Sequence, residues 1–167
     1  WCSDYEVDLS ELSDFEVPVL PSGARDSQIV ERLIVPEDQA LVVVVAETLV
    51  ASDFPEINFV FGRSAFDRRS VIVSSMGLEQ VPILGLTVHE LGHSFGLVSP
   101  EANRHSDAYG FEGHCKNDCI MEAVNDERDM SESVQKIAEN PACLGFCSEC
   151  FDEMSRWSAA ESRSQTV

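Results

Sequence analysis

Two histidines and a glutamate stand at the spacing of a metal-binding helix. His89 and His93 are four positions apart, and Glu90 directly follows the first of them. Because positions i and i+4 lie on one face of an α-helix, both imidazoles can bind the same metal ion. Glu90 is rotated by about 100° around the helix, where it can reach a water molecule on that metal without being a ligand. The pattern H-E-x-x-H therefore predicts a hydrolytic zinc site with His89 and His93 as ligands and Glu90 as general base.

The residues around this pattern predict a buried helix. Pro82 lies where the first turn is expected, and Gly96 follows the second histidine as a stop signal. A chance match in an irregular segment is the alternative. Apolar side chains before and among the histidines argue against it: Ile83, Leu84, Leu86, Leu91 and Phe95.

The elements that must position this helix are short. Apolar runs bounded by turn residues predict strands, and other segments have helical periodicity. The run 41–47 does not alternate with polar residues, which predicts a strand buried on both faces. We expect a mixed α/β (α+β) fold in which a twisted sheet of about four to five strands packs on the metal helix. The predicted strands are 15–20, 41–47, 57–62 and 70–75, and the other predicted helices are 25–35, 127–139 and 146–160.

Length and composition indicate one domain. A chain of 167 residues with 44% hydrophobic residues can bury a sufficient core without a metal or a disulfide. We expect residues 15–160 to form this domain, with flexible ends at 1–14 and 161–167 and an insertion at 97–113 beside the cleft. The apolar runs are too short to span a bilayer.

The charge is strongly negative. Thirty acidic residues against 11 basic ones give a formal net charge of −19. Such a surface repels nucleic acid and anionic membranes, so we expect neither as a partner. Simple solubility is one interpretation. The other is adaptation to a salt-rich cytoplasm, where ~1 M salt shortens the Debye length to about 3 Å and relieves self-repulsion, which thermal melting in a potassium chloride series would test.

The third ligand of the predicted zinc is not determined by the motif itself. In the extended pattern H-E-x-x-H-x-x-G-x-x-H the last histidine falls on Ser99 here, and serine is a poor zinc ligand. His105 lies in a polar stretch typical of a surface loop. Glu112 would suit a site completed from a second helix, but glycines on both sides of it disfavour a helix. His114 is a further candidate, and residue types and spacing alone leave these alternatives open.

The cysteines form two close pairs. Cys115 and Cys119 enclose three residues, and Cys147 and Cys150 enclose two, which is within the range of structural zinc sites. Reduced buried thiols or a disulfide are the alternatives. Cys143 could replace one ligand, and Cys2 is too isolated to interpret. Short spacings of this kind suit metal binding better than the disulfide network of a secreted domain, so we expect a cytoplasmic protein.

The chain resembles the archaemetzincins. A His-Cys pair, a second cysteine and a methionine follow one another over residues 114–121, and a Cys-x-x-Cys follows at Cys147. Upstream, residues 54–62 and 70–75 are similar to the strands that this family places before its metal helix. The resemblance covers residues 41–154 and includes an insertion between Gly96 and His114, at a place where leishmanolysin-like metzincins also carry one.

The resemblance implies a metzincin-like fold and a zinc-dependent metallopeptidase. It implies His114 as third ligand of a catalytic zinc and Met121 as the methionine turn beneath it. A second, structural zinc would be held by the four cysteines Cys115, Cys119, Cys147 and Cys150. Water on the catalytic zinc, with Glu90 as general base, would hydrolyse short or unfolded peptides lying antiparallel to the strand 70–75, taken as the sheet edge. The alternative function is a zinc-binding scaffold protein with little or no turnover.

Overall fold

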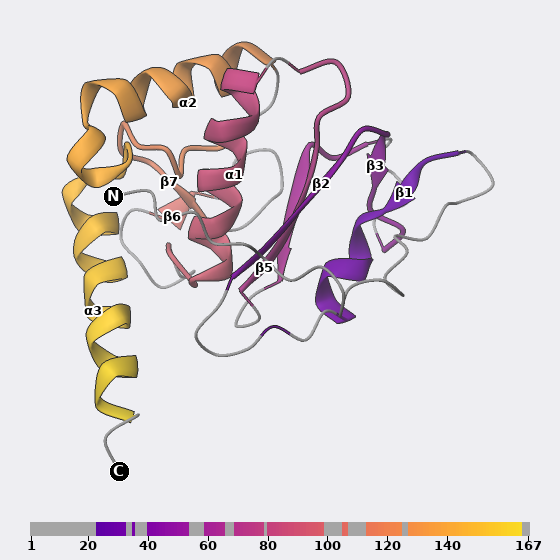
Figure 1. The fold of residues 1–167 in the computed structure, drawn as a ribbon. Coiled ribbons are helices and arrows are strands. Elements are labelled where there is room, and N and C mark those ends of the chain that lie inside the picture. Colours follow the sequence, from indigo (N-terminus) through magenta and orange to yellow (C-terminus); the bar gives the residue numbers. More distant parts are fainter. Residues whose placement is uncertain are drawn as a thin grey trace.

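The fold is known from a computed structural model. It describes residues 23–32, 35, 40–53, 59–65, 69–78, 80–98, 105–106, 113–124 and 127–164. The expected flexible stretch at 1–14 and the predicted strand at 15–20 lie outside these residues, as does most of the insertion. The described elements run from a small β-rich part to a helical part (Figure 1).

The main sheet has three strands in the described part of the chain. β2 (Leu41–Val45) runs parallel to β5 (Ser70–Ser74), and β4 (Gly62–Ala65) runs antiparallel on the other side of β5. Every residue of β5 is buried. The sequence-based prediction that 70–75 forms the sheet edge is therefore wrong. Among the described strands β5 is central, because it pairs with β2 on one side and with β4 on the other, so β2 and β4 are the two edge strands.

The strand β2 also differs from its prediction. Its side chains alternate between partly buried and exposed, with Val42 and Val44 exposed, so only one face packs on the core. A run of valines is typical of strands whether one face or both faces are buried. The run alone therefore does not predict how many faces of β2 pack on the core.

The segment expected as an α-helix at 25–35 is instead a short strand and a 3-10 helix. β1 (Arg25–Asp26) pairs in parallel with β3 (Leu49–Val50), and the 3-10 helix η2 (Ser27–Arg32) follows. The Asp26 carboxylate accepts a hydrogen bond from the Gln28 backbone N–H at 3.0 Å and one from the Ser52 hydroxyl at 2.9 Å. Asp26 thus starts a tight turn that favours η2 over a full α-helix.

The helix predicted around the histidines is present. α1 (Gln80–Ser94) packs against β4 and β5, and Gly96 follows it with φ +70°, the left-handed conformation that ends a helix. α2 (Glu127–Glu139) has the predicted bounds and lies across one end of α1 (Figure 1). α3 (Ser148–Ser164) begins and ends a few residues later than predicted. Its last turn includes residues 161–164, where a flexible tail was expected.

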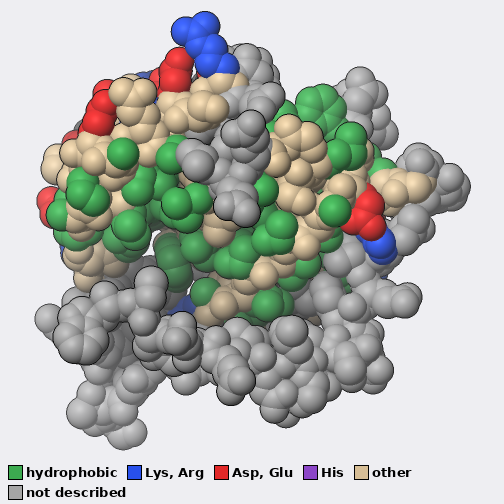
Figure 2. Space-filling view, turned by 45° about the horizontal axis from the view of Figure 1, so that its top comes forward, with side chains coloured by type: hydrophobic (Ala, Val, Ile, Leu, Met, Phe, Trp, Pro, Cys, Tyr) green, Lys and Arg blue, Asp and Glu red, His purple; other side chains and the backbone are tan. Residues whose placement is uncertain are grey.

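The predicted fold class is confirmed. A mixed sheet is followed by the α1 helix, by a loop with the short strands β6 (His105–Ser106) and β7 (His114–Cys115), and by two helices. No helix within the described residues is long and apolar enough to cross a membrane. On the face in Figure 2, hydrophobic side chains occupy the centre and acidic ones lie near the rim, so the negative charge is unevenly distributed there.

Candidate metal centres

Three histidines from two segments converge. His89 and His93 come from α1 and His114 from β7, and one ring nitrogen of each lies within 4.8 Å of the others. The Nε2 atoms of His89 and His93 are only 3.0 Å apart. The structure therefore brings together the three residues predicted to form the histidine centre.

Burial lowers the pKa of the two helix histidines, His89 and His93, and so favours their neutral forms at neutral pH. Desolvation lowers the pKa of His89 to about 4, and it places the pKa of His93 well below its usual value. The carbonyl oxygen of Ile120 lies 2.7 Å from His89 Nδ1 and can only accept, so Nδ1 carries the proton and Nε2 is free. The lone pair of His89 Nε2 thus faces His93. His93 Nε2 donates a hydrogen bond to this lone pair when its proton is on Nε2, and with the proton on Nδ1 both Nε2 lone pairs are available to a cation bound between them.

Glu90 is held against the edge strand β4. A Cβ added to Gly62 would lie 2.8 Å from Glu90 Oε1, so only glycine leaves room for the carboxylate. Burial raises the pKa of Glu90 to about 8, while a hydrogen bond from Ser64 and the charge of Arg63 act in the opposite direction. A carboxyl group with a pKa near neutrality can both accept and return a proton.

Met121 lies directly beneath α1. Its side chain is fully buried, and a Cβ added at Gly92 would overlap its sulfur atom. Gly92 stands between His89 and His93, so its missing side chain is what lets Met121 pack against the histidine-bearing face. This position agrees with the one expected for the methionine turn.

The four predicted cysteines also converge. Their sulfur atoms all lie within 4.8 Å of one another: those of Cys115, Cys119, Cys147 and Cys150. The five described cysteines, Cys143 included, are free thiols, so no disulfide forms among them, and Cys143 is not part of the cluster. The Cys147 backbone N–H donates to Cys119 Sγ at 3.2 Å. This bond and a side-chain hydrogen bond with Cys150 lower the pKa of the Cys119 thiol, which favours the thiolate that binds metals.

One loop joins the two centres. His114 and Cys115 are neighbours on β7, with one side chain in each cluster. The Cys115 backbone N–H donates to the Met121 carbonyl oxygen at 2.7 Å, which closes the loop on itself. Its Ile120 carbonyl oxygen is the acceptor for His89. The histidine and cysteine centres therefore share a single backbone segment.

Of the alternative third ligands, only His105 lies within the described residues. His105 pairs with Cys115 in the β6–β7 ladder, but its ring is not part of the cluster. Glu112 and Ser99 lie outside the described residues. Sequence reasoning missed Gly62, Ser64 and Gly92. Of these three, only Gly92 could have been predicted from the sequence, because a glycine inside a helical pattern often marks a place where another side chain packs closely against the helix.

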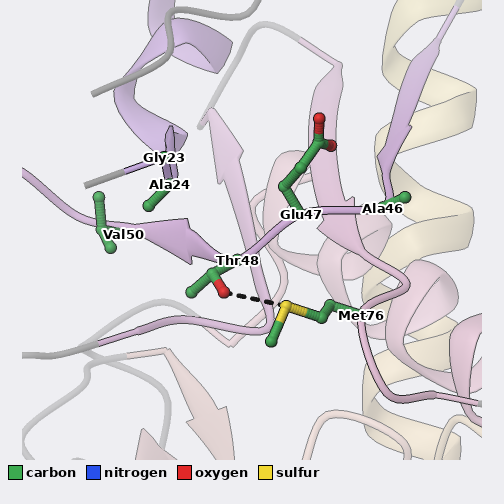
Figure 3. Close-up of a pocket in the computed structure, with 7 residues that line it drawn as sticks. All are labelled: Gly23, Ala24, Ala46, Glu47, Thr48, Val50 and Met76. Atoms are coloured by element: carbon green, nitrogen blue, oxygen red, sulfur yellow. Dashed lines mark hydrogen bonds between the residues drawn. The ribbon is translucent and has the colours of Figure 1, made fainter. Parts of the chain in front are cut away.

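A pocket of about 480 Å³ lies away from these centres, where β1 approaches β3. Figure 3 shows the Thr48 hydroxyl donating to Met76 Sδ, a bond of 3.0 Å. The Glu47 carboxylate beside it is already paired with Arg25 at 2.7 Å. The pocket therefore offers little chemistry of its own.

The fold and the histidine arrangement define a metzincin-like protein. A helix carrying H-E-x-x-H packs on a mixed sheet, a later loop adds the third histidine, and a methionine lies beneath them. No protein-family model matches the chain. A curated relative and two solved structures agree with this class.

The chain belongs to the archaemetzincin family. It is 32% identical over 113 residues to the Archaemetzincin of Nanoarchaeum equitans (strain Kin4-M). The match covers 67% of this chain and 54% of that relative, so the chain spans about half the length of the curated relative. The predicted family resemblance is thereby confirmed.

Two crystal structures share the fold. The archaemetzincin of Methanopyrus kandleri superposes with a TM-score of 0.58 at 22% identity, covering 82% of this chain and 67% of that one. The archaemetzincin of Archaeoglobus fulgidus, crystallised with malonate, has a TM-score of 0.54 at 22% identity and covers 78% of this chain and 69% of that one. These similarities support the fold of the region that carries the two centres.

Proposed function

We propose that the chain is a zinc metallopeptidase that hydrolyses peptide bonds in short or unfolded peptides. The observation that carries this proposal is the meeting of three histidines from two segments, with a buried glutamate next to one of them on the same helix. His89, His93 and His114 would hold the catalytic zinc. Zinc in such a site acts as a Lewis acid that polarises a carbonyl group and activates water near neutral pH.

Glu90 would move the proton. Its carboxylate accepts a proton from the attacking water and delivers it to the amine of the departing peptide, so that one carboxyl group and one amine are formed. Gly62 and Ser64 hold this carboxylate in place from the strand β4. His89 is oriented for its part by the Ile120 carbonyl.

The edge strand β4 is the better candidate for the substrate-binding strand. It pairs with β5 on one side only among the described strands, and Glu90 lies against it. An extended peptide added along its free edge would pass next to the proposed general base. This replaces the central strand β5, whose two edges are already paired.

The four cysteines would hold a second, structural zinc. Four thiol ligands without an open position are the composition of a closed site. The hydrogen bond from the Cys147 amide to Cys119 supports thiolate at this place. Two zinc ions per chain are therefore expected. The cytoplasm remains our proposed compartment, with peptides as partners and neither nucleic acid nor membrane.

The test replaces Glu90 and leaves the ligands in place. Glu90→Gln and Glu90→Ala should retain the zinc content of the wild type but cleave a peptide library at least ~100-fold more slowly, the usual size of general-base catalysis. Glu132→Ala is the matched control, because this glutamate is exposed on α2 and pairs only with Arg128. Equal cleavage by wild type and both Glu90 variants would remove the peptidase assignment and leave the zinc-binding scaffold.

A further inference from the structure

Lys136 is a half-buried cation that faces the loop between the two centres. It lies on α2, and its side chain is 18% exposed. Its ammonium group donates to three acceptors: the Cys119 carbonyl oxygen at 3.3 Å, Asp118 Oδ1 at 3.1 Å and Glu122 Oε2 at 2.6 Å. A lysine has three donors, so all of them are used on one short stretch of the chain.

That stretch carries groups of both centres. It contains Cys119, and its Ile120 carbonyl oxygen accepts the hydrogen bond that orients His89. The Ile120 backbone N–H donates in turn to the Gly145 carbonyl oxygen at 2.9 Å. A shift of residues 118–122 would therefore move the ligand Cys119. It would also break the hydrogen bond that fixes which ring nitrogen of His89 carries the proton.

The ion pairs alone would not give Lys136 this importance. Glu122 and Asp118 have side chains that are 56% and 87% exposed, and pairs of that kind contribute about 0–1 kcal/mol. The bond to the Cys119 carbonyl is different, because it acts on the backbone of a ligand residue.

The negative charge of the proposed cysteine centre is a second reason why Lys136 matters. Four thiolates and one Zn²⁺ sum to −2, and this chain has an excess of acidic over basic residues. Taking such a group out of water is costly unless a counter-charge is near. Lys136 and Lys116 are the two lysines of the sequence. Lys116 lies inside the first cysteine pair but is exposed, whereas Lys136 is distant in sequence and packed against the loop.

We infer that Lys136 is a positioning residue for both metal centres, holding the segment 118–122 and placing a positive charge against the backbone of Cys119. This inference rests on the proposed two-zinc function. It goes beyond that function because it names a residue outside both clusters on which both depend. The lysine inside the cysteine motif, by contrast, has no such role.

The experiment compares Lys136→Met with Lys116→Met, which remove the same charge. Zinc affinity is measured by chelator competition, and cobalt(II) substitution separates the centres, since only the cysteine centre gives sulfur-to-cobalt charge-transfer bands. Lys136→Met should weaken metal binding at the cysteine centre by at least about tenfold, the size of outer-shell effects, with a smaller loss at the histidine centre. Lys116→Met should stay within about twofold of the wild type. Equal, small effects of the two substitutions would overturn the inference.

A second readout does not depend on metal. Hydrogen exchange of the Ile120 and Cys115 amides in the metal-free protein should be faster in Lys136→Met than in Lys116→Met, because the segment 118–122 is released. Unchanged exchange in both variants would count against the inference. A wild type that binds no metal at the cysteines would refute the second zinc site, while the exchange data would still test Lys136.

Discussion

The two candidate metal centres are built in different ways. In the histidine centre, the helix α1 places two of the three ligands by its own periodicity, and β7 adds one. In the cysteine centre, the ligands come from β7, the following loop, the residue before α3 and its first turn. One centre is mostly the property of a helix, whereas the other depends on two loops that meet.

This difference implies an unequal dependence between the centres. The cysteine cluster holds the loop that delivers His114 and the Ile120 carbonyl, so the histidine centre needs it. The helix α1, in contrast, contributes no ligand to the cysteine cluster. Substitution of a cysteine ligand should therefore also weaken metal binding at the histidine centre. Substitution of a histidine ligand should affect the cysteine centre much less.

The largest expected effect tests this asymmetry directly. Cys150→Ser should reduce zinc affinity at the cysteine centre by at least about 100-fold, and at the histidine centre by about tenfold, because the loop carrying His114 loses its anchor. His93→Ala should abolish only the histidine centre. Zinc analysis and cobalt(II) spectra of both variants provide the measurement. If Cys150→Ser lost one zinc and kept the other at full affinity, the two centres would be independent.

A smaller effect concerns the packing between α1 and the shared loop. Gly92→Ala forces a methyl group onto the buried Met121 sulfur, and overpacking of this kind costs about 1–3 kcal/mol, against roughly 1 kcal/mol gained from helix propensity. We expect a net loss of about 1 kcal/mol in the free energy of unfolding, measured by urea denaturation.

A double-mutant cycle separates this clash from other effects. With Met121→Ala in the background, Gly92→Ala should no longer destabilise the protein, because the methyl group finds space. Leu84→Ala, at an exposed position of the same helix, is the control and should change stability little. The same loss with and without Met121 would show that the two residues do not interact.

The smallest effect concerns an ion pair outside both clusters, between Asp53 and Arg63. Hydrogen bonds from Arg63 on β4 lower the pKa of Asp53 to about 2, against an ordinary 3.8. Since the folded-state pKa is depressed, the stabilisation is fully present well above pH 4 and is lost as the pH falls towards 2. Because both side chains are partly exposed, we expect Asp53→Asn to cost about 0.5 kcal/mol at pH 7.

Urea denaturation at several pH values checks this prediction. The difference between wild type and Asp53→Asn should shrink as the pH falls from 4 towards 2, and the zinc content of both centres should not change at neutral pH. A difference that stayed constant across this range would mean that the carboxylate charge of Asp53 is not its cause.

Local patterns were read correctly where a single element carries the information. The four-residue spacing of His89 and His93 requires only a helix, and α1 and α2 lie where periodicity and capping signals put them. The cysteine pairs were found for a similar reason, since each pair is close in sequence. The 3-10 helix η2 differs from the prediction, because the Asp26 carboxylate accepts a hydrogen bond from the Gln28 backbone N–H and so competes with the helical pattern.

What the sequence determined by itself is therefore the local chemistry: which residues can bind metal, which glutamate stands beside them and which segments are helical. Tertiary structure alone decided that β5 is central and β4 an edge strand, that Glu90 rests on Gly62, and that Lys136 contacts the loop between the centres. The reason is physical. Helical periodicity and close spacing act between neighbours in the chain, whereas strand order and the packing of distant side chains depend on how the whole core closes.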